Sequence, residues 1–129
     1  MSDVLKTFSK QLLNLNKTLS KRFPENKELS LGVTAIETII YNNNSKKLAE
    51  MFVLYVYKYK DDVMNKNEQF LLDKDYLEND TKTKENINII DNLKKNWQML
   101  NNEEKEPIWQ YLQVLMVLIE KYIKQTITT

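Results

Sequence analysis

The chain has 129 residues, of which 42% are hydrophobic and 29% charged, a balance that predicts a single folded domain over residues 1–129 with a sizeable core. It contains no cysteine and no histidine, which excludes disulfides, thiol nucleophiles, imidazole bases and ordinary structural zinc sites. Its single glycine, Gly32, excludes the glycine-rich phosphate loops, which need several. A formal net charge of +1 gives no strong overall field, so an electrostatic partner would have to bind a local patch.

The first predicted helix covers residues 3–22, with Ser2 as its N-cap. Apolar residues recur in it at alternating spacings of three and four, which predicts one buried face. These residues are Leu5, Phe8, Leu12, Leu15 and Leu19. Pro24 ends this helix, because the residue before a proline is disfavoured in the α region. A second, shorter helix is predicted over residues 27–41, and the asparagine run 42–44 ends it.

A third helix is predicted over residues 45–62, with Ser45 as its N-cap. Residues 52–59 are rich in aromatic and β-branched side chains, which also suit a strand. We prefer a helix, because no other segment offers a second strand with which it could pair. Residues 63–82 are polar with short apolar islands, and they are predicted to form a long connection that holds one helical turn.

A fourth helix is expected from about residue 83, with Ile87, Ile90, Leu93, Trp97 and Leu100 on one face.

Asn101 and Glu104 have the spacing of a capping box and should start the last helix. Pro107 fits in this helix only near the first turn or at a kink. Two adjacent apolar stripes then recur, which predicts burial over much of the circumference. The expected fold is an all-α, compact bundle of about five helices, with the C-terminal helix near residues 107–125 at its centre.

Carboxylates are the only general acids or metal ligands that remain, and they cluster at residues 61–62 and 73–75. A calcium loop needs oxygen ligands at alternate positions, a central glycine and a final glutamate. Counted from Asp73, the fifth position is Leu77 and the glycine position is Glu78, so the pattern fails. We interpret both clusters as solvated loop acids. The sequence predicts no catalytic residue, no metal site and no cofactor, and we expect that the chain is not an enzyme.

A basic stripe in the first predicted helix is the strongest functional signal. Four lysines at spacings of 4, 7 and 4, followed by an arginine, make up the candidate binding residues Lys6, Lys10, Lys17, Lys21 and Arg22. Residues 1–23 hold five basic residues and one acid, a net charge of +4, whereas residues 61–80 hold seven acids and two lysines, a net charge of −5. Such a stripe can contact phosphates, lie on a membrane surface or dock on an acidic partner. It is equally typical of an ordinary solvated helix in a lysine-rich protein, which is the simpler interpretation.

The alternation of Tyr55, Tyr57 and Tyr59 with Lys58 and Lys60 is similar to the interleaved aromatic and basic residues of single-strand binders. On a helix, however, Tyr55 and Tyr59 face the core while Tyr57 points elsewhere. These rings cannot form one stacking platform, so we interpret them as core packing.

No segment has the character of a targeting or membrane-spanning sequence. Residues 1–22 carry four lysines, and the longest apolar run, residues 114–119, has six residues where a membrane helix needs about 20. We therefore expect a soluble, intracellular protein.

The composition also carries a genomic signal. Lys, Asn, Ile and Tyr supply 50 residues, whereas Gly, Ala, Arg and Pro supply six. Lysine outnumbers arginine eighteen to one, although arginine is the better residue for bidentate recognition. The favoured residues have AT-rich codons, so an AT-rich genome of a virus, a protist or a low-GC bacterium explains the bias better than physical selection does.

Two stretches carry a family resemblance, residues 96–100 and 107–115. Trp97 precedes a short acidic turn, and the helix after the turn reads IWQYLQVL over residues 108–115. This pattern resembles small uncharacterised all-helical proteins of nucleocytoplasmic large DNA viruses, above all the giant viruses of amoebae. The resemblance implies a viral protein of the virion or of the viral factory in the host cytoplasm, and it assigns no catalytic residue. The helical apoptosis regulators of AT-rich poxviruses fit less well, because their Asn-Trp-Gly-Arg turn is missing here.

The leading functional hypothesis is a non-enzymatic structural or protein-interaction protein of viral origin, which binds a protein partner or forms a homo-oligomer through its two opposite patches. The alternative is a nucleic-acid-binding accessory protein that uses the basic face of the first helix. Such binding should be independent of sequence, because the chain has one arginine and no groove-reading motif. Salt separates the two hypotheses, since phosphate binding by several lysines weakens steeply as salt rises.

Overall fold

The structure is a computed structural model that describes residues 2–72 and 89–128. Over these ranges no strand occurs, which confirms the predicted all-α fold. The same ranges hold seven α-helices and two short 3₁₀ helices, where about five helices were predicted. The elements are α1 Ser2–Arg22, α2 Lys27–Tyr41, α3 Ser45–Tyr55, η1 Tyr57–Tyr59, α4 Lys60–Met64, α5 Gln69–Leu72, α6 Ile89–Asn96, η3 Trp97–Met99 and α7 Asn102–Thr128.

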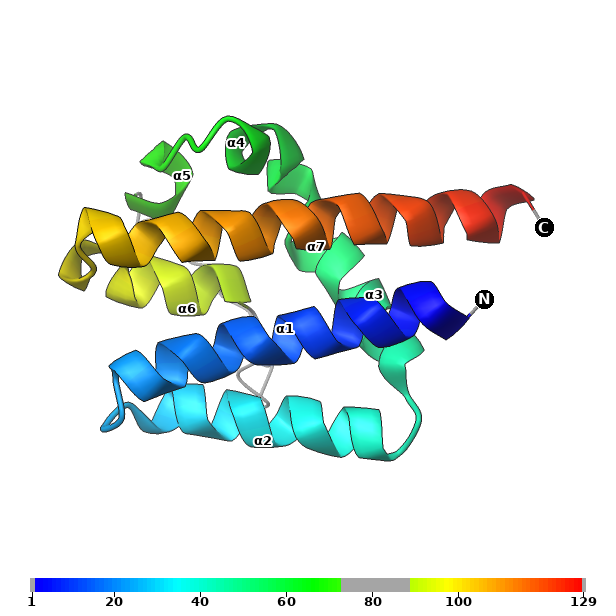
Figure 1. The fold of residues 1–129 in the computed structure, drawn as a ribbon, viewed down its shortest axis with the longest axis horizontal. Helices are drawn as coiled ribbons and strands as arrows, with labels where there is room; N and C mark the ends of the chain where they lie inside the picture. Colours follow the sequence, from blue (N-terminus) through cyan, green and yellow to red (C-terminus); the bar gives the residue numbers. More distant parts are fainter. Residues whose placement is uncertain (1, 73–88, 129) are drawn as a thin grey trace.

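The longest helix, α7, lies across the middle of the bundle (Figure 1). α1 runs antiparallel beside it, and α2 packs against the other side of α1. α3 passes behind α1 and α7, while α4 and α5 lie on the side of α7 away from α1 (Figure 1). The C-terminal helix is therefore central, as predicted.

One hydrophobic cluster includes residues from all seven α-helices. α1 and α7 bury the faces that their apolar periodicity predicts. The fully buried residues of these two helices include Phe8, Leu12, Leu15 and Leu19 of α1 and Ile108, Leu112, Leu115, Met116 and Ile119 of α7. The rings of Phe8 and of Phe52 in α3 pack edge to face, with 5.1 Å between ring centroids, so α3 is joined to the same core.

Asparagine side chains and backbone define both ends of α2. Asn26 precedes the helix, and its Oδ1 accepts hydrogen bonds from two backbone N–H groups of the first turn at 3.0 and 3.3 Å. After the helix, Asn43 adopts a left-handed φ of 59°, and the amides of Asn43 and Asn44 donate to two of the last helical carbonyls. This is a Schellman ending, in which asparagine takes the place that glycine usually holds. The asparagine run thus ends α2, as predicted.

The predicted third helix over residues 45–62 is wrong in its second half. α3 ends at Tyr55, Val56 forms a turn, and η1 and α4 follow. β-branched and aromatic residues lose side-chain freedom in a helix, so a break within this stretch costs little. With the break in place, Val56 and Val63 are both buried in the core.

Two predicted N-caps are also wrong by one residue. Ser45 is the first residue of α3, and Asn44 holds the N-cap position without a side-chain cap hydrogen bond. Ser2 is the first residue of α1 and does not precede it. Each shift concerns one residue at a helix end and leaves the buried residues of α1 and α3 unchanged.

The long connection predicted over residues 63–82 is described only as far as Leu72. α5 supplies the single helical turn that was expected, and its Leu71 is buried. The acidic cluster at residues 73–75, the rest of the connection and the predicted start of the fourth helix lie outside the described residues. From residue 89 onward, α6 and η3 bury Ile90, Leu93 and Trp97 as predicted.

α7 begins with the predicted capping box. The Asn101 N–H donates to Glu104 Oε1 at 2.9 Å, and the Glu104 N–H donates to Asn101 Oδ1 at 2.8 Å. Arg22 at the end of α1 donates from Nε to Glu104 Oε2 at 2.5 Å and from Nη2 to the Met99 carbonyl at 3.2 Å. The end of α1 is thereby tied to the start of α7. Pro107 lies in the second turn of α7, and the helix continues through it.

Candidate functional site

The part of the chain that the structure describes holds no group of three acidic residues that could bind a metal ion. Asp61 is exposed and Asp62 is half-buried. Asp62 accepts a hydrogen bond from the Asn67 side chain at 3.0 Å, so it closes the turn after α4. Among the described helices, none combines the length and the hydropathy needed to cross a membrane.

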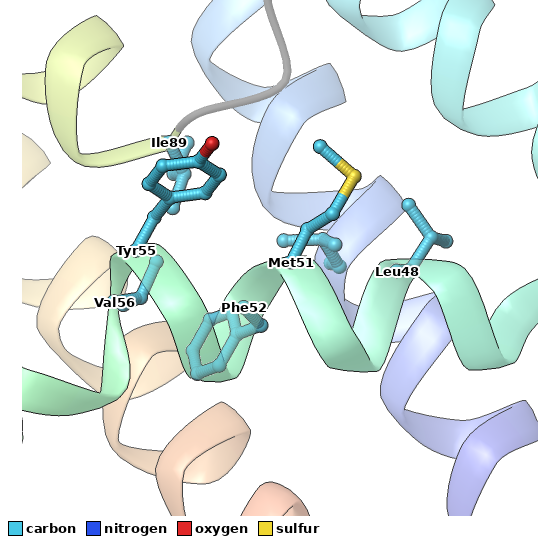
Figure 2. A pocket seen from close by; sticks show the side chains of 7 residues that line it. Leu48, Met51, Phe52, Tyr55, Val56 and Ile89 are labelled. Carbon is cyan, nitrogen blue, oxygen red and sulfur yellow. The ribbon is translucent and has the colours of Figure 1, made fainter. Parts of the chain in front are cut away.

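The cavity shown in Figure 2 lies between α1, α3 and the start of α6. It is lined by Leu12, Leu48, Met51, Phe52, Tyr55, Val56 and Ile89. Its volume is about 10 Å³, whereas a small-molecule site usually needs about 300–1,000 Å³. Apart from Tyr55, its lining side chains are apolar and could not orient a ligand. We interpret it as a packing gap.

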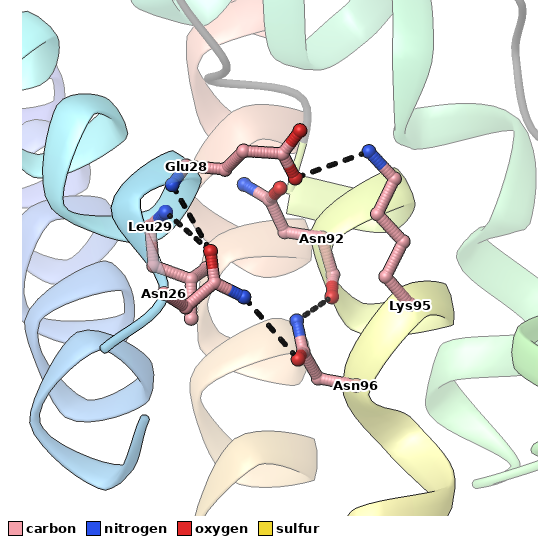
Figure 3. Close-up of polar contacts among 6 residues, drawn as sticks. All are labelled: Asn26, Glu28, Leu29, Asn92, Lys95 and Asn96. Atoms are coloured by element: carbon pink, nitrogen blue, oxygen red, sulfur yellow. Dashed lines mark hydrogen bonds and ion pairs between the residues drawn. The ribbon is translucent and has the colours of Figure 1, made fainter. Parts of the chain in front are cut away.

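A polar seam joins α2 to α6 (Figure 3). Asn26 Nδ2 donates to Asn96 Oδ1 at 3.5 Å, and Asn96 Nδ2 donates to the Asn92 carbonyl at 2.8 Å. On the same side, Lys95 Nζ lies 3.2 Å from Glu28 Oε1. These contacts connect the capped start of α2 to a helix 70 residues further along the chain.

An open depression of about 390 Å³ adjoins this seam. It is lined by Arg22, Phe23, Pro24, Glu25, Asn26, Asn96 and Met99. Apart from Glu25, its polar side chains (Arg22, Asn26 and Asn96) already form hydrogen bonds within the protein. The depression therefore has few groups left with which to recognise a ligand.

The predicted lysine stripe lies on the solvent side of α1, but only some of its residues are free of ion pairs with other described side chains. Lys6, Lys10 and Lys21 are exposed and form no ion pair within the described ranges. Lys17 Nζ lies 3.5 Å from Glu37 Oε2 of α2, with both side chains about half exposed at 53% and 49%. The fifth predicted residue, Arg22, is held by Glu104 and the Met99 carbonyl. Three of the five cations therefore remain available to a partner.

The three tyrosines at positions 55, 57 and 59 do not form one stacking platform, in agreement with the sequence analysis. The Tyr59 ring stacks on Phe70 of α5 with 4.8 Å between centroids. The Tyr57 hydroxyl instead donates to Glu120 of α7 at 3.0 Å. All three side chains are half-buried and pack against the core, including Tyr57, which was expected to point elsewhere.

Glu120 connects α7 to the segment that follows α3. Its Oε2 accepts the Tyr57 hydroxyl and pairs with Lys60. The hydrogen bond from Lys60, followed by that from Tyr57, lowers the pKa of the Glu120 carboxyl. The hydrogen bond to Glu120 raises the pKa values of both Lys60 and Tyr57. All three shifts favour the ordinary neutral-pH charge states, so none of these groups is prepared for proton transfer near pH 7.

Glu68 connects the start of α5 to η3 and α7 in a similar way, beside an aromatic cluster. It accepts the Trp97 indole N–H at 2.6 Å and the Lys105 ammonium at 3.2 Å. The Trp97 hydrogen bond is the main reason that the pKa of the Glu68 carboxyl is lowered. Trp97 meets Trp109 at 5.2 Å between ring centroids, and Trp109 lies 6.5 Å from Phe70. The cluster holds α5, η3 and α7 together.

The outward side of α7 carries a surface that the sequence analysis did not single out. From residue 107 to residue 119 the helix has no charged residue, although 29% of the chain is charged. Val114 and Val117 lie on the outward side and are 46% and 45% exposed. Gln110 is exposed beside them, while Tyr111 and Leu118 are half-buried. The sequence signal was present as a long uncharged run, but it was interpreted as burial alone.

Neighbouring helices extend this surface on both sides. Gln113 Nε2 donates to the carbonyls of Val63 and Met64 at 3.3 Å, which places the partly exposed Met64 beside α7. Towards α1, Gln11 helps to line a shallow depression of about 320 Å³ beside α7. We call the combined surface the uncharged α7 face, and it consists of Gln11, Met64, Gln110, Tyr111, Val114, Val117 and Leu118.

Comparison of the chain with protein-family models, curated proteins and solved structures gave no match. The resemblance to proteins of large DNA viruses therefore stays a prediction, carried by residues 96–100 and 107–115. These residues lie around η3 and in the first half of α7. Trp97 and Trp109 are both buried there against each other, so packing accounts for the spacing of the two tryptophans.

Proposed function

We propose that the chain is a non-enzymatic protein-interaction protein that binds its partner through the uncharged α7 face. The observation that carries this proposal is an outward helix surface that stays free of charge for about three and a half turns. Single exposed apolar residues are common on a protein surface, but Val114 and Val117 are neighbours on one outward face and no charged residue separates them. Depletion of charge around exposed aliphatic and tyrosine side chains is typical of the centre of a protein–protein interface.

Site-specific photo-crosslinking in cells that express the chain tests this proposal. A benzoylphenylalanine at position 114 should form covalent adducts with the partner, because Val114 lies at the centre of the face. The matched control is the same probe at Leu31 of α2, another exposed aliphatic residue, at 57% exposure. A Val117→Lys substitution should abolish the adducts from position 114. Equal adducts from both probe positions, or none from position 114, would contradict the proposal.

Viral origin, with a place in the virion or the viral factory, is also a proposal. Its support is the amino-acid composition, which favours residues with AT-rich codons, and the resemblance at residues 96–100 and 107–115. Mass spectrometry of purified virions and of fractionated infected cells tests it. Detection in the virion or the factory fraction would support a viral structural role, and absence from both would contradict it.

Sequence-independent binding of nucleic acid is a second candidate function. One observation favours it: Lys6, Lys10 and Lys21 are exposed along α1 without an ion-pair partner in the part of the chain that is described. Three phosphate contacts would give a log–log slope of affinity against salt of about −3. Fluorescence anisotropy with labelled duplex and single-stranded DNA at several salt concentrations measures this slope.

A matched pair of variants makes the nucleic-acid test specific. The test variant changes Lys6, Lys10 and Lys21 to Gln, and the control changes three exposed lysines of other segments, Lys27, Lys46 and Lys47, to Gln. Both variants remove the same charge. Binding that only the first variant loses would support the second function, whereas equal loss, or no binding at low salt, would contradict it.

A further inference from the structure

We propose that the uncharged α7 face is covered by a second copy of the same helix, which runs antiparallel to the first about a two-fold axis. This inference rests on the proposed function and names the partner. It follows from the spacing of the outward residues of α7, from the charges at the two ends of the face, and from the symmetry that would pair those charges.

The outward residues of α7 follow the spacing of a helix-pairing seam. They recur at alternating intervals of four and three, which is the pattern that keeps one line of side chains facing a second helix. In chain order they are Glu103, Pro107, Gln110, Val114, Val117 and Lys121. The line therefore has an acidic end, an uncharged middle and a basic end.

The two charged residues at the ends of this line form no ion pair with the described part of the chain. Glu103 and Lys121 are exposed, and neither forms an ion pair within residues 2–72 and 89–128. They are 18 residues apart in the sequence, which is five full helical turns, so they lie on the same line at about 27 Å from each other. That distance is too long for them to pair within one molecule.

An antiparallel second copy would satisfy both charges at once. If the two-fold axis lies at the level of residue 112, Glu103 of each copy faces Lys121 of the other. The same register places Pro107 opposite Val117 and Gln110 opposite Val114, so the uncharged layers also meet. A parallel pair would instead place Glu103 against Glu103 and Lys121 against Lys121, which is repulsive. The charges thus select the antiparallel arrangement, in which both copies use the same surface.

The surroundings of the seam leave room for a second helix and add apolar area. Half-buried Tyr111 and Leu118 lie along one side of the seam, and Met64 of α4 lies along the other. In the view of Figure 1 no other helix passes in front of α7. Stable interfaces bury about 1,200–2,000 Å² in total, so a five-turn seam with these flanks belongs at the lower end of that range. Interfaces of that size are typical of weak, reversible association, so we expect the dimer to dissociate on dilution.

A charge exchange tests the pairing. Glu103→Lys alone, or Lys121→Glu alone, places like charges at both ends of the seam and should weaken dimerisation about tenfold or more. The double variant restores opposite charges with reversed polarity and should return the dissociation constant to within about threefold of the original. Sedimentation velocity at low salt over a range of concentrations measures the dimer, and circular dichroism verifies that each variant is folded.

Matched controls separate pairing from net charge. Glu50→Lys and Lys46→Glu make the same charge changes at exposed positions of α3, away from the seam, and should leave the dimer unchanged. Equal weakening by the control and seam variants would overturn the inference. So would a double variant that stays as weak as the single ones.

Cysteine pairs test the direction of the helices, since the chain has no cysteine of its own. Pro107→Cys and Val117→Cys chains should form a disulfide when they are mixed and almost none when either is oxidised alone. In a parallel dimer, each variant alone would crosslink to itself, and that result would overturn the antiparallel register.

A chain that stays monomeric up to about 1 mM, with no disulfide in the mixture, would overturn the second copy as the partner. The proposed function is judged separately by the photo-crosslinks from position 114. Adducts with a different protein would retain the proposed function while the dimer fails, and the absence of any adduct would refute both.

Discussion

Three glutamates join segments that are distant in the sequence, and each one does so in its ionised form. Their carboxylates accept hydrogen bonds, which lower the pKa of each carboxyl group. The main donors are the Trp97 indole for Glu68, the Asn101 backbone N–H for Glu104 and the Lys60 ammonium for Glu120. Protonation of any of these carboxyls removes the negative charge from a tertiary contact and weakens the hydrogen bonds that the carboxyl accepts.

Acid should therefore destabilise the fold. The pKa of each of the three carboxyls is lower in the folded state than in the unfolded chain, where it is about 4.3. The unfolded chain thus binds more protons in mild acid, and the free energy of unfolding falls as the pH drops below about 5 and through the folded pKa values. Urea unfolding at pH 7, 5, 4 and 3 measures this loss.

Glu120→Gln provides the control for the acid experiment, because glutamine cannot ionise. The variant should be less stable at pH 7, since it loses the charge that Lys60 and Tyr57 contact, and its stability should depend less on pH. If the variant and the original chain lose stability in parallel on acidification, Glu120 does not contribute as described.

Asn43 shows how a single backbone angle limits the choice of residue. Its φ of 59° lies in the left-handed region, which glycine adopts freely and asparagine tolerates. Asn43→Ala should lower the free energy of unfolding by about 1 kcal/mol, because a Cβ without a compensating polar group is strained there. Asn43→Gly should leave it unchanged or raise it slightly. Urea unfolding of both variants checks the pair, and equal effects would show that the strain is not decisive.

At the level of helices, Arg22 connects the end of α1 to the start of α7, beside the hydrophobic core that packs the two helices together. It bonds both Glu104, in the capping box of α7, and the Met99 carbonyl just before it. Arg22→Gln should therefore lower the midpoint of urea unfolding. Lys21→Gln, one residue earlier, removes the same charge from an exposed side chain that forms no ion pair with any described residue. If the two variants have the same midpoint, the Arg22 contact contributes nothing measurable.

The sequence predicts α1, α2 and α7 well because local rules decide them. Apolar spacing marks the buried faces, Pro24 and the asparagines mark the ends of α1 and α2, and the Asn101–Glu104 pair marks the start of α7. The break after Tyr55 could not be predicted in the same way, since the helical spacing continues through Tyr59. It accompanies tertiary contacts of Tyr57 and Lys60 with Glu120 of α7, which is 63 and 60 residues away from them.

The candidate surfaces were predictable only in part, for a related reason. Lysine spacing identifies the basic side of α1, but Glu37 and Glu104, which are distant in the sequence, decide that Lys17 and Arg22 are engaged while the others are exposed. On α7, apolar and uncharged residues occur around the whole helix. Periodicity alone cannot say which of these stripes faces the core, so the exposure of Val114 became evident only from the packing.

At the scale of the molecule, the packing connects the two ends of the chain. α1 is packed between α2 and α7, and α3 contacts all three of these helices. The hydrophobic cluster is continuous from Phe8 to Ile119 and includes residues from every described α-helix. If any described helix detached, the buried face of a neighbouring helix would become exposed to water. We therefore expect the bundle to unfold in one cooperative transition.

Two optical signals test this cooperativity because they report on different parts of the molecule. Both tryptophans, Trp97 and Trp109, lie in the η3–α7 region, so tryptophan fluorescence reports on that region. Far-ultraviolet circular dichroism reports on all helices together.

Leu15 is fully buried in α1, and Leu15→Ala should cost about 2–5 kcal/mol through lost burial and the cavity that remains. In a cooperative bundle, this change in α1 shifts the tryptophan transition and the dichroism transition by the same amount. Leu31→Ala, at a position 57% exposed, should shift neither appreciably. A dichroism transition that moves while the tryptophan transition stays in place would show that α1 to α3 unfold independently of α7.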